Sequence, residues 1–169
     1  MKLDTKRLII IPLTYNQLTK YIQTDGSLEK ELEVNFIQRN VPPELADAFI
    51  KTIFPAVTNE KNNYLFSTLW TIILKEKNVM VGDLCFKGTP NEKGEIEIGY
   101  GTYDLFKGNG YMTEAILAVS EWAFNQKYVC SIVAETENSN TPSHRVLEKC
   151  GFKQYLYVEN MIWWRLNKN

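Results

Sequence analysis

The sequence is poor in the residues that build metal centres and disulfide frameworks. Its 169 residues include only three cysteines and one histidine. The cysteines (Cys85, Cys130 and Cys150) are widely spaced, odd in number and form no Cys-x-x-Cys pair. Structural zinc sites use clustered Cys and His ligands, and a disulfide framework needs paired cysteines. We therefore expect no metal site, and free thiols in a reducing compartment.

The chain also lacks an excess of charge and a long apolar run. Its 19 Lys and Arg residues against 20 Asp and Glu residues give a formal net charge of −1. Domains that bind nucleic acid are normally strongly basic, so no nucleic-acid partner is expected. The first apolar run is cut by Pro12, and no later run reaches the roughly 20 residues of a membrane span. These features predict a soluble, cytoplasmic protein that does not bind a membrane.

The hydrophobic spacing is typical of one α/β domain that covers residues 1–169. Strands are expected at residues 7–13, 66–74, 79–87, 95–102, 129–134 and 155–166. Helices are expected at residues 15–22, after Pro42, after Met112 and at residues 142–150. In the helix after Pro42, one face is expected to carry Leu45, Ala46, Phe49, Ile50 and Ile53, and residues 55–63 are expected to form a polar loop.

Two glycines stand in a short loop between a predicted strand and a predicted helix. The first turn of a helix has N–H groups without internal partners, and the helix dipole adds partial positive charge there. Gly108 and Gly110 leave room for a phosphate to approach, and Lys107 adds Coulomb attraction. The same pattern is equally typical of a tight turn without a ligand. Neither a GxxxxGK[ST] motif nor a complete GxGxxG motif is present.

A second segment, residues 134–152, predicts a strand, a polar turn and a short helix. Pro142 stands in the expected first turn of the helix, and Gly151 follows its end. Asn140 or Thr141 can cap the helix. By physical reasoning alone, this segment is a well-formed short helix.

Both segments resemble motifs of the GNAT superfamily of acetyltransferases. Residues 107–112, KGNGYM, resemble the R/Q-x-x-G-x-G/A loop that holds the coenzyme A pyrophosphate, with Lys107 in place of Arg or Gln and Met112 in place of a small residue. The TEA that follows, and the N-x-x-S-x-x-x-L-x-K-x-G-F run from Asn140 to Phe152, resemble the RimJ/RimL-like branch. Both motifs occur in the family's order.

The resemblance implies an α/β (α+β) fold with a central mixed, mostly antiparallel sheet flanked by helices, in which the fourth and fifth strands splay apart. It also implies acetyl-CoA as co-substrate, with no metal. The residues implied to bind this cofactor are Tyr100, Gly101, Thr102, Lys107, Gly108, Asn109, Gly110, Tyr111, Met112, Thr113, Asn140 and Ser143.

Acetyl transfer to an amine needs a base, because alkyl amines are mostly protonated at neutral pH. Our candidate is Glu97, a carboxylate in the strand beside the expected thioester, with Glu135 and Glu137 as weaker alternatives. Ser143 is the candidate acid for the departing thiolate, because Leu147 stands where many relatives carry a tyrosine.

The sequence therefore predicts an N-acetyltransferase that moves acetyl to a primary amine, either a protein N-terminus or a small molecule, by direct attack in a ternary complex. Two alternatives stay open. One is a sensor or regulatory module of the same fold that binds acyl-CoA without turnover. The other is an unrelated α/β interaction domain. The acceptor amine is not identified by the sequence, nor is the choice between monomer and homodimer.

Overall fold

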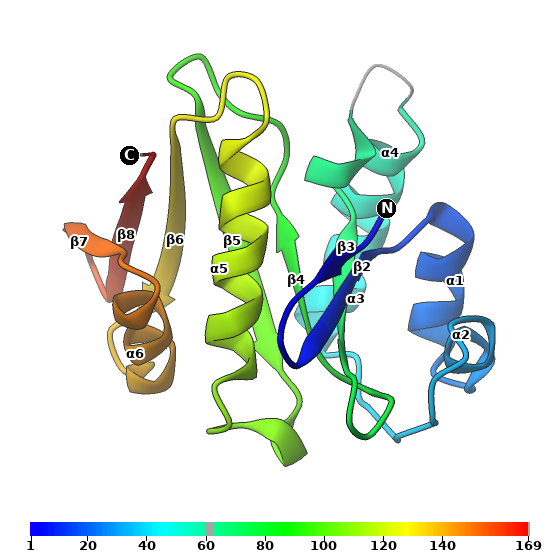
Figure 1. The fold of residues 1–169 in the computed structure, drawn as a ribbon. Coiled ribbons are helices and arrows are strands. Elements are labelled where there is room, and N and C mark those ends of the chain that lie inside the picture. Colours follow the sequence, from blue (N-terminus) through cyan, green and yellow to red (C-terminus); the bar gives the residue numbers. More distant parts are fainter. Residues whose placement is uncertain (60–62, 169) are drawn as a thin grey trace.

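In the computed structural model, which describes residues 1–59 and 63–168, the chain folds around one eight-stranded sheet of order β1-β2-β3-β4-β5-β6-β8-β7 (Figure 1). All neighbouring strands are antiparallel except β5 and β6, which are parallel, so the predicted mixed, mostly antiparallel sheet is confirmed. The strands are β1 (Leu3–Asp4), β2 (Leu8–Pro12), β3 (Leu69–Leu74), β4 (Val79–Phe86), β5 (Glu95–Thr102), β6 (Ser131–Glu137), β7 (Lys153–Val158) and β8 (Met161–Asn167).

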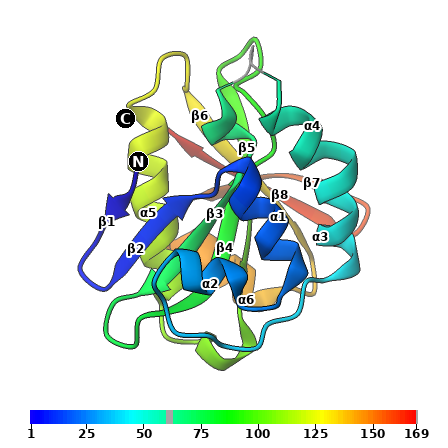
Figure 2. The same cartoon turned by 90° about the vertical axis from the view of Figure 1, so that its right-hand side faces the viewer.

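Helices cover both faces of the sheet. Figure 2 views the molecule from the side of α1 (Tyr15–Gln23), α2 (Ser27–Glu31), α3 (Pro43–Ala48) and α4 (Phe54–Val57). The opposite face carries α5 (Tyr111–Phe124) and α6 (Thr141–Lys149). Each face has its own apolar core. Tyr21 and Phe49 are buried in the first core, and Ile116 and Leu147 in the second.

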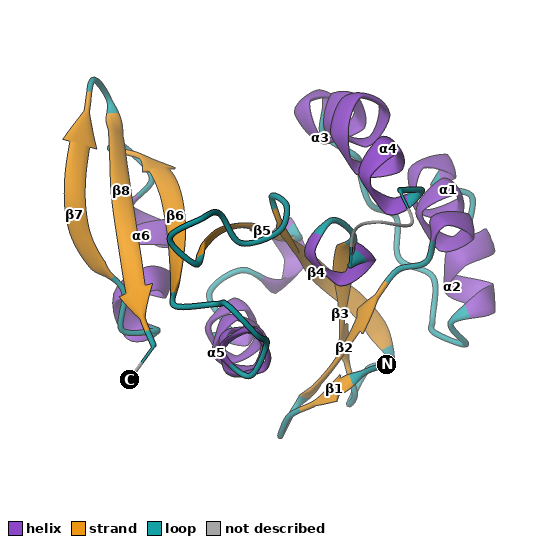
Figure 3. Ribbon diagram, turned by 90° about the horizontal axis from the view of Figure 1, so that it is seen from above, coloured by secondary structure: helices purple, strands orange, loops and turns teal. Residues whose placement is uncertain are grey.

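Strands β5 and β6 separate after a short paired stretch. Residues 95–97 of β5 pair with residues 131–133 of β6, and the ladder ends there. Strand β5 stays paired with β4 as far as Thr102, so beyond Glu97 only its edge toward β6 is free. Figure 3 shows the two halves of the sheet diverging on either side of β5. These are the predicted fourth and fifth strands, renumbered because the two-residue β1 was not predicted.

The structure corrects the prediction for residues 42–59. Helix α3 continues through a π-helical turn, Phe49–Ile53, into α4, so Pro55 lies in a helix and not in a polar loop. A π turn holds more residues than an α turn and shifts the helical spacing. Phe49 and Ile53 are buried as predicted, but Ile50 is 69% exposed and does not share their face. Residues 60–62 of the predicted loop lie outside the described residues.

The C-terminal segment is a hairpin rather than one strand. Residues 153–158 and 161–167 form β7 and β8, joined at Glu159 and Asn160. The turn contains no glycine, and Glu159 itself takes the left-handed conformation with φ of 53°. The sequence therefore carries no turn signal at this position. Helix α2, only five residues long, was not predicted either.

Candidate active site

The free edge of β5 borders two cavities. The first, of about 640 Å³, is walled by the starts of α5 and α6, and we name it the helix-start cavity. The second, of about 700 Å³, lies on the side of α1–α3 and has Tyr21, Asp83 and Tyr103 in its wall. We name it the tyrosine cavity. Both cavities are lined by Tyr100, Gly101, Thr102, Phe106 and Lys107.

The helix-start cavity has a cluster of unpaired backbone donors. Within the described residues, none of the N–H groups of residues 108–113 donates a hydrogen bond, and the first bond of α5 runs from Glu114 N to Gly110 O. Gly108 and Gly110 have φ of 79° and 76°, which side-chain-bearing residues rarely adopt. The unpaired N–H groups and the positive end of the α5 dipole therefore favour an anion beside this loop.

Arg7, which directly precedes β2, contacts this loop. Its Nη1 donates to Asn109 O at 3.0 Å, and its Nε pairs with Glu114 at 2.6 Å. The Thr5 hydroxyl also donates to Glu114, at 2.7 Å. Burial raises the pKa of Glu114, but the hydrogen bonds from Thr5 and Arg7 outweigh it and lower the pKa overall. The carbonyl of Asn109 accepts from Arg7, and Asn109, which we predicted to bind the cofactor, is not part of the cavity wall.

The start of α6 forms the far wall of the helix-start cavity. Asn140 Oδ1 caps α6 by accepting from Ser143 N at 3.2 Å. The Tyr100 hydroxyl crosses from β5 and donates to Ser143 O at 3.3 Å, and burial raises the pKa of Tyr100 to about 12. Among the described residues, the Ser143 hydroxyl has no hydrogen-bond partner, so it is free to donate into the cavity. Leu147 is fully buried in the core.

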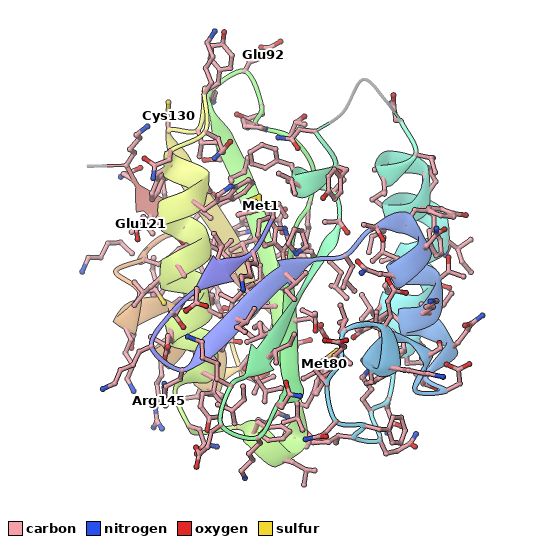
Figure 4. The ribbon with its side chains drawn as sticks, turned by 45° about the vertical axis from the view of Figure 1, so that its right-hand side comes forward. Met1, Met80, Glu92, Glu121, Cys130 and Arg145 are labelled. Carbon is pink, nitrogen blue, oxygen red and sulfur yellow. The ribbon has the colours of Figure 1, made fainter. Side chains whose placement is uncertain are left out.

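The remaining loop residues that we predicted to bind the cofactor line the helix-start cavity. Met112 is only 4% exposed, since its side chain packs in the core beneath the loop. Lys107 forms an ion pair with Asp104 at 2.6 Å, which lowers the pKa of Asp104. Figure 4 shows Arg145, a residue of this wall, at the opposite end of the molecule from Cys130. The thiol of Cys130 therefore lies away from the site.

The predicted base, Glu97, lies outside both cavity walls. Its carboxylate pairs with Lys87, which directly follows the neighbouring strand β4. Glu135 and Glu137 are exposed on β6 and also lie outside the walls. The catalytic role of Glu97 stays a prediction.

The tyrosine cavity contains a buried carboxylate held by two hydroxyl groups. Tyr21 and Tyr103 each donate to Asp83 Oδ2 at 2.7 Å. Asp83 is 6% exposed, and its burial raises its pKa although both hydrogen bonds act to lower it. Burial likewise raises the pKa of both tyrosines, so their hydroxyl groups stay protonated and keep donating.

Arg39 fixes one of these tyrosines. It is 5% exposed, pairs with Glu29 at 3.3 Å and donates to Tyr21 O at 2.7 Å. Its guanidinium lies 4.0 Å from the centre of the Tyr21 ring. A buried charge is costly unless it is paired, and here the pairing partner and the ring both hold Arg39 against α1. Arg39 therefore positions Tyr21, although its Nη2 is buried without a hydrogen-bond partner.

The sequence model of the acetyltransferase (GNAT) domain matches residues 7–153. The chain belongs to the GNAT acetyltransferase family. The uncharacterized N-acetyltransferase YjdG of Bacillus subtilis is 39% identical over 98 residues, which are 53% of this chain and 58% of YjdG. The matched part thus spans less than two thirds of that relative.

Solved structures share the fold over nearly the whole chain. The ribosomal-protein-S5-alanine acetyltransferase of Vibrio fischeri has a TM-score of 0.69 at 14% identity, covering 99% of this chain and 96% of that one. RimL, a ribosomal L7/L12 α-N-protein acetyltransferase solved in complex with coenzyme A, has a TM-score of 0.65 at 15% identity, covering 99% and 98%. At 14% and 15% identity these neighbours show that the fold is shared.

Within the described residues, no group of three or more His, Cys, Asp and Glu side chains could hold a metal ion. No helix there has the length and apolarity that crossing a membrane requires.

Sequence reasoning missed the Asp83 cluster and Arg7. Tyr21, Arg39, Asp83 and Tyr103 come from four separate segments, so no spacing within one element connects them. The only local signal was an aspartate in an otherwise apolar strand, residues 79–86, because an unpaired carboxylate is costly to bury. Arg7 directly precedes its strand and gave no signal of its contact with the loop at residue 109.

Proposed function

We propose that this protein is an acetyl-CoA-dependent N-acetyltransferase that moves acetyl to a primary amine by direct attack in a ternary complex. The observation that carries this proposal is the free edge of β5 with a cavity on each side, one of them furnished with unpaired N–H groups at residues 108–113. Two reactants can enter from opposite sides and meet at Tyr100–Thr102.

The helix-start cavity fits coenzyme A. Its unpaired N–H groups at residues 108 and 110–113 suit a diphosphate, which needs several donors and no large net charge. The free edge at residues 100–102 can pair with the amides of a pantetheine arm as an added strand would. Because Asn140 Oδ1 is used in capping, Nδ2 is the atom that Asn140 would offer to this arm. Support comes from RimL, which has this fold and was solved with coenzyme A.

The chemistry follows from holding the two reactants together. The amine nitrogen forms a bond to the acetyl carbon while the carbon–sulfur bond breaks, and positioning supplies most of the rate. An N–H on the free edge of β5 can stabilise the developing oxyanion. In this proposal the free hydroxyl of Ser143, a residue of the cavity wall, donates a proton to the departing thiolate.

A module that binds acyl-CoA without turnover is the second candidate. Leu147 favours it, because this residue is fully buried at the position where many relatives carry the tyrosine acid. Such a module would keep the helix-start cavity and lack only the acid that protonates the departing thiolate.

Two measurements test the proposal. Coenzyme A at about one hundred times its dissociation constant should raise the free energy of unfolding by about 2.7 kcal/mol. Thiol release from acetyl-CoA should then be followed with 2-phenylethylamine, phenylalanine, spermidine and a peptide with a free N-terminus. Absence of stabilisation at millimolar coenzyme A would contradict both candidates. Stabilisation without thiol release from any amine would leave the binding module.

A further inference from the structure

The wall of the tyrosine cavity carries more negative than positive charge. Its carboxylates are Glu44, Asp83 and Asp104, and its cations are Arg39 and Lys107. Both cations are already in ion pairs, Arg39 with Glu29 and Lys107 with Asp104. Within the described residues, Asp83 and Glu44 therefore have no salt-bridge partner. The rest of the wall is largely apolar or aromatic, with Ile37, Leu45, Leu69, Leu105 and Phe106.

The Asp83 cluster reaches the cavity through Tyr103. Tyr21 is 1% exposed, and its hydrogen bond to Asp83 is buried. Tyr103 is more exposed, and its hydrogen bond to the same oxygen is only part-buried. A group inside the cavity can therefore meet the Tyr103 hydroxyl, whose oxygen can accept a hydrogen bond while its proton is donated to Asp83.

The cluster lies beside the strand segment that borders both cavities. Asp83 is paired with Gly101 in the β4–β5 ladder, and Tyr103 directly follows Thr102. Neighbouring strands lie about 4.8 Å apart. An amine held where the cavities meet is thus within reach of Tyr103.

We infer that Asp83 accepts the proton of the acceptor amine through the Tyr103 hydroxyl, and that the acceptor is a primary ammonium on an apolar body. This rests on the proposed acetyl transfer. The nitrogen loses two protons as it becomes an amide. One proton passes to the Tyr103 hydroxyl as Tyr103 gives its own proton to Asp83 Oδ2. The proton on Asp83 later leaves to solvent. The other ends on the sulfur, and coenzyme A departs as the thiol. Tyr21 is a positioning residue.

The titration of Asp83 is set by groups from every element around it. Burial raises its pKa, and the hydroxyl groups of Tyr21 and Tyr103, the charge of Arg39 and the hydroxyl of Thr71 act in the opposite direction. The Thr71 hydroxyl and Asp83 Oδ1 are both buried and make no hydrogen bond of ordinary geometry, so Thr71 contributes least. Cys85, next on the same side of β4, is held as a thiol because burial raises its pKa to about 11.

The test is the pH profile of kcat/KM for the fastest amine of the panel, at saturating acetyl-CoA. Asp83→Asn should lower kcat/KM at least about 100-fold and remove the acid limb of the profile, while leaving the Kd of acetyl-CoA unchanged. Tyr103→Phe should lower kcat/KM about 10-fold or more. Tyr21→Phe should stay active, with its acid limb at higher pH. The Tyr21 hydrogen bond lowers the pKa of Asp83 in wild type, so removing it raises this pKa. Asp47→Asn, on the exposed face of α3, is the matched control and should behave as wild type.

The contrary outcomes are distinct. If Asp83→Asn and Tyr103→Phe keep the wild-type profile, or if the acid limb disappears only in Glu97→Gln, the inference is wrong and the acetyltransferase proposal stands. If Asp83→Asn does not fold, Tyr103→Phe and Tyr21→Phe decide alone, since both retain the aromatic packing. If wild type binds coenzyme A but acetylates no amine, the proposed function fails first.

The amine class has its own test. 2-Phenylethylamine should give a kcat/KM at least about tenfold above that of phenylalanine, because the carboxylate of phenylalanine would meet the unpaired Asp83 and Glu44. The reverse order would overturn the amine class, and so would acetylation of another amine of the panel with none of 2-phenylethylamine.

Discussion

The two cavities beside β5 share residues 100–102, 106 and 107 but differ in the rest of their walls. The helix-start cavity is walled by residues 100–102, 106–108 and 110–113, several with unpaired N–H groups, and by α6 with its cap Asn140. The tyrosine cavity is walled by side chains that α1, the segment before α3, β4 and the end of β5 bring together. A site made of main-chain groups depends on local conformation, whereas a site made of distant side chains depends on the tertiary fold. A substitution that impairs one site should therefore leave the other site intact.

The largest effect is expected from Gly110→Val, which should impair cofactor binding in the helix-start cavity alone. Valine at φ of 76° is strained, so the loop should shift and at least two charge-assisted hydrogen bonds to the diphosphate should be lost. Acetyl-CoA affinity should then fall about 100-fold, as titration calorimetry would measure. Gly88→Val is the matched control, since Gly88 also has positive φ, at 113°, and lies outside both cavity walls. Equal affinity in the two folded variants would remove the loop from the site.

Asn140→Ala should have a smaller effect on the same side. Loss of the α6 cap should lower the free energy of unfolding by about 1 kcal/mol. Loss of one hydrogen bond to the pantetheine arm should weaken acetyl-CoA binding about fivefold. Thr14→Ala removes the cap of α1 and should cost similar stability in urea unfolding without changing acetyl-CoA affinity. If both variants bind acetyl-CoA equally, Asn140 only caps its helix.

The smallest effect is expected from Glu114→Gln, which weakens the contacts of Glu114 with Thr5 and Arg7 behind the loop. At about pH 7 this variant should lose about 1 kcal/mol of stability, because Glu114 accepts from Thr5 and Arg7. Burial raises the pKa of Glu114, but the hydrogen bonds from Thr5 and Arg7 lower it by more, so the net shift is downward from 4.5. The stabilisation is therefore present above that value and lost as the pH falls through the folded pKa. Urea midpoints of wild type and variant should differ at about pH 7 and converge once the pH falls below the folded pKa of Glu114; a constant difference would show that the carboxylate charge is not involved.

The same contrast explains what the sequence could predict. Gly108, Gly110 and Asn140 act within a few residues of their own position, so the motif and the capping pattern located the helix-start cavity. The positions of the main strands also follow from local alternation, as in residues 95–102, whereas the architecture of the sheet was implied only by the family resemblance.

Three features could not be predicted because they depend on long-range packing. The π turn at Phe49–Ile53 changes the helical spacing, and no residue type marks it. The turn at Glu159 uses a left-handed non-glycine residue. The Asp83 cluster joins residues that are 62 and 20 positions apart along the chain.

The most direct measurement of the central claim is backbone amide hydrogen exchange with and without saturating coenzyme A. In the free protein the amides of residues 108–113 should exchange rapidly, because they have no acceptor within the described structure. With coenzyme A bound, these amides should become protected, together with those of residues 100–102 that face the free edge of β5. Coenzyme A binding that leaves exchange at residues 108–113 unchanged would contradict the account.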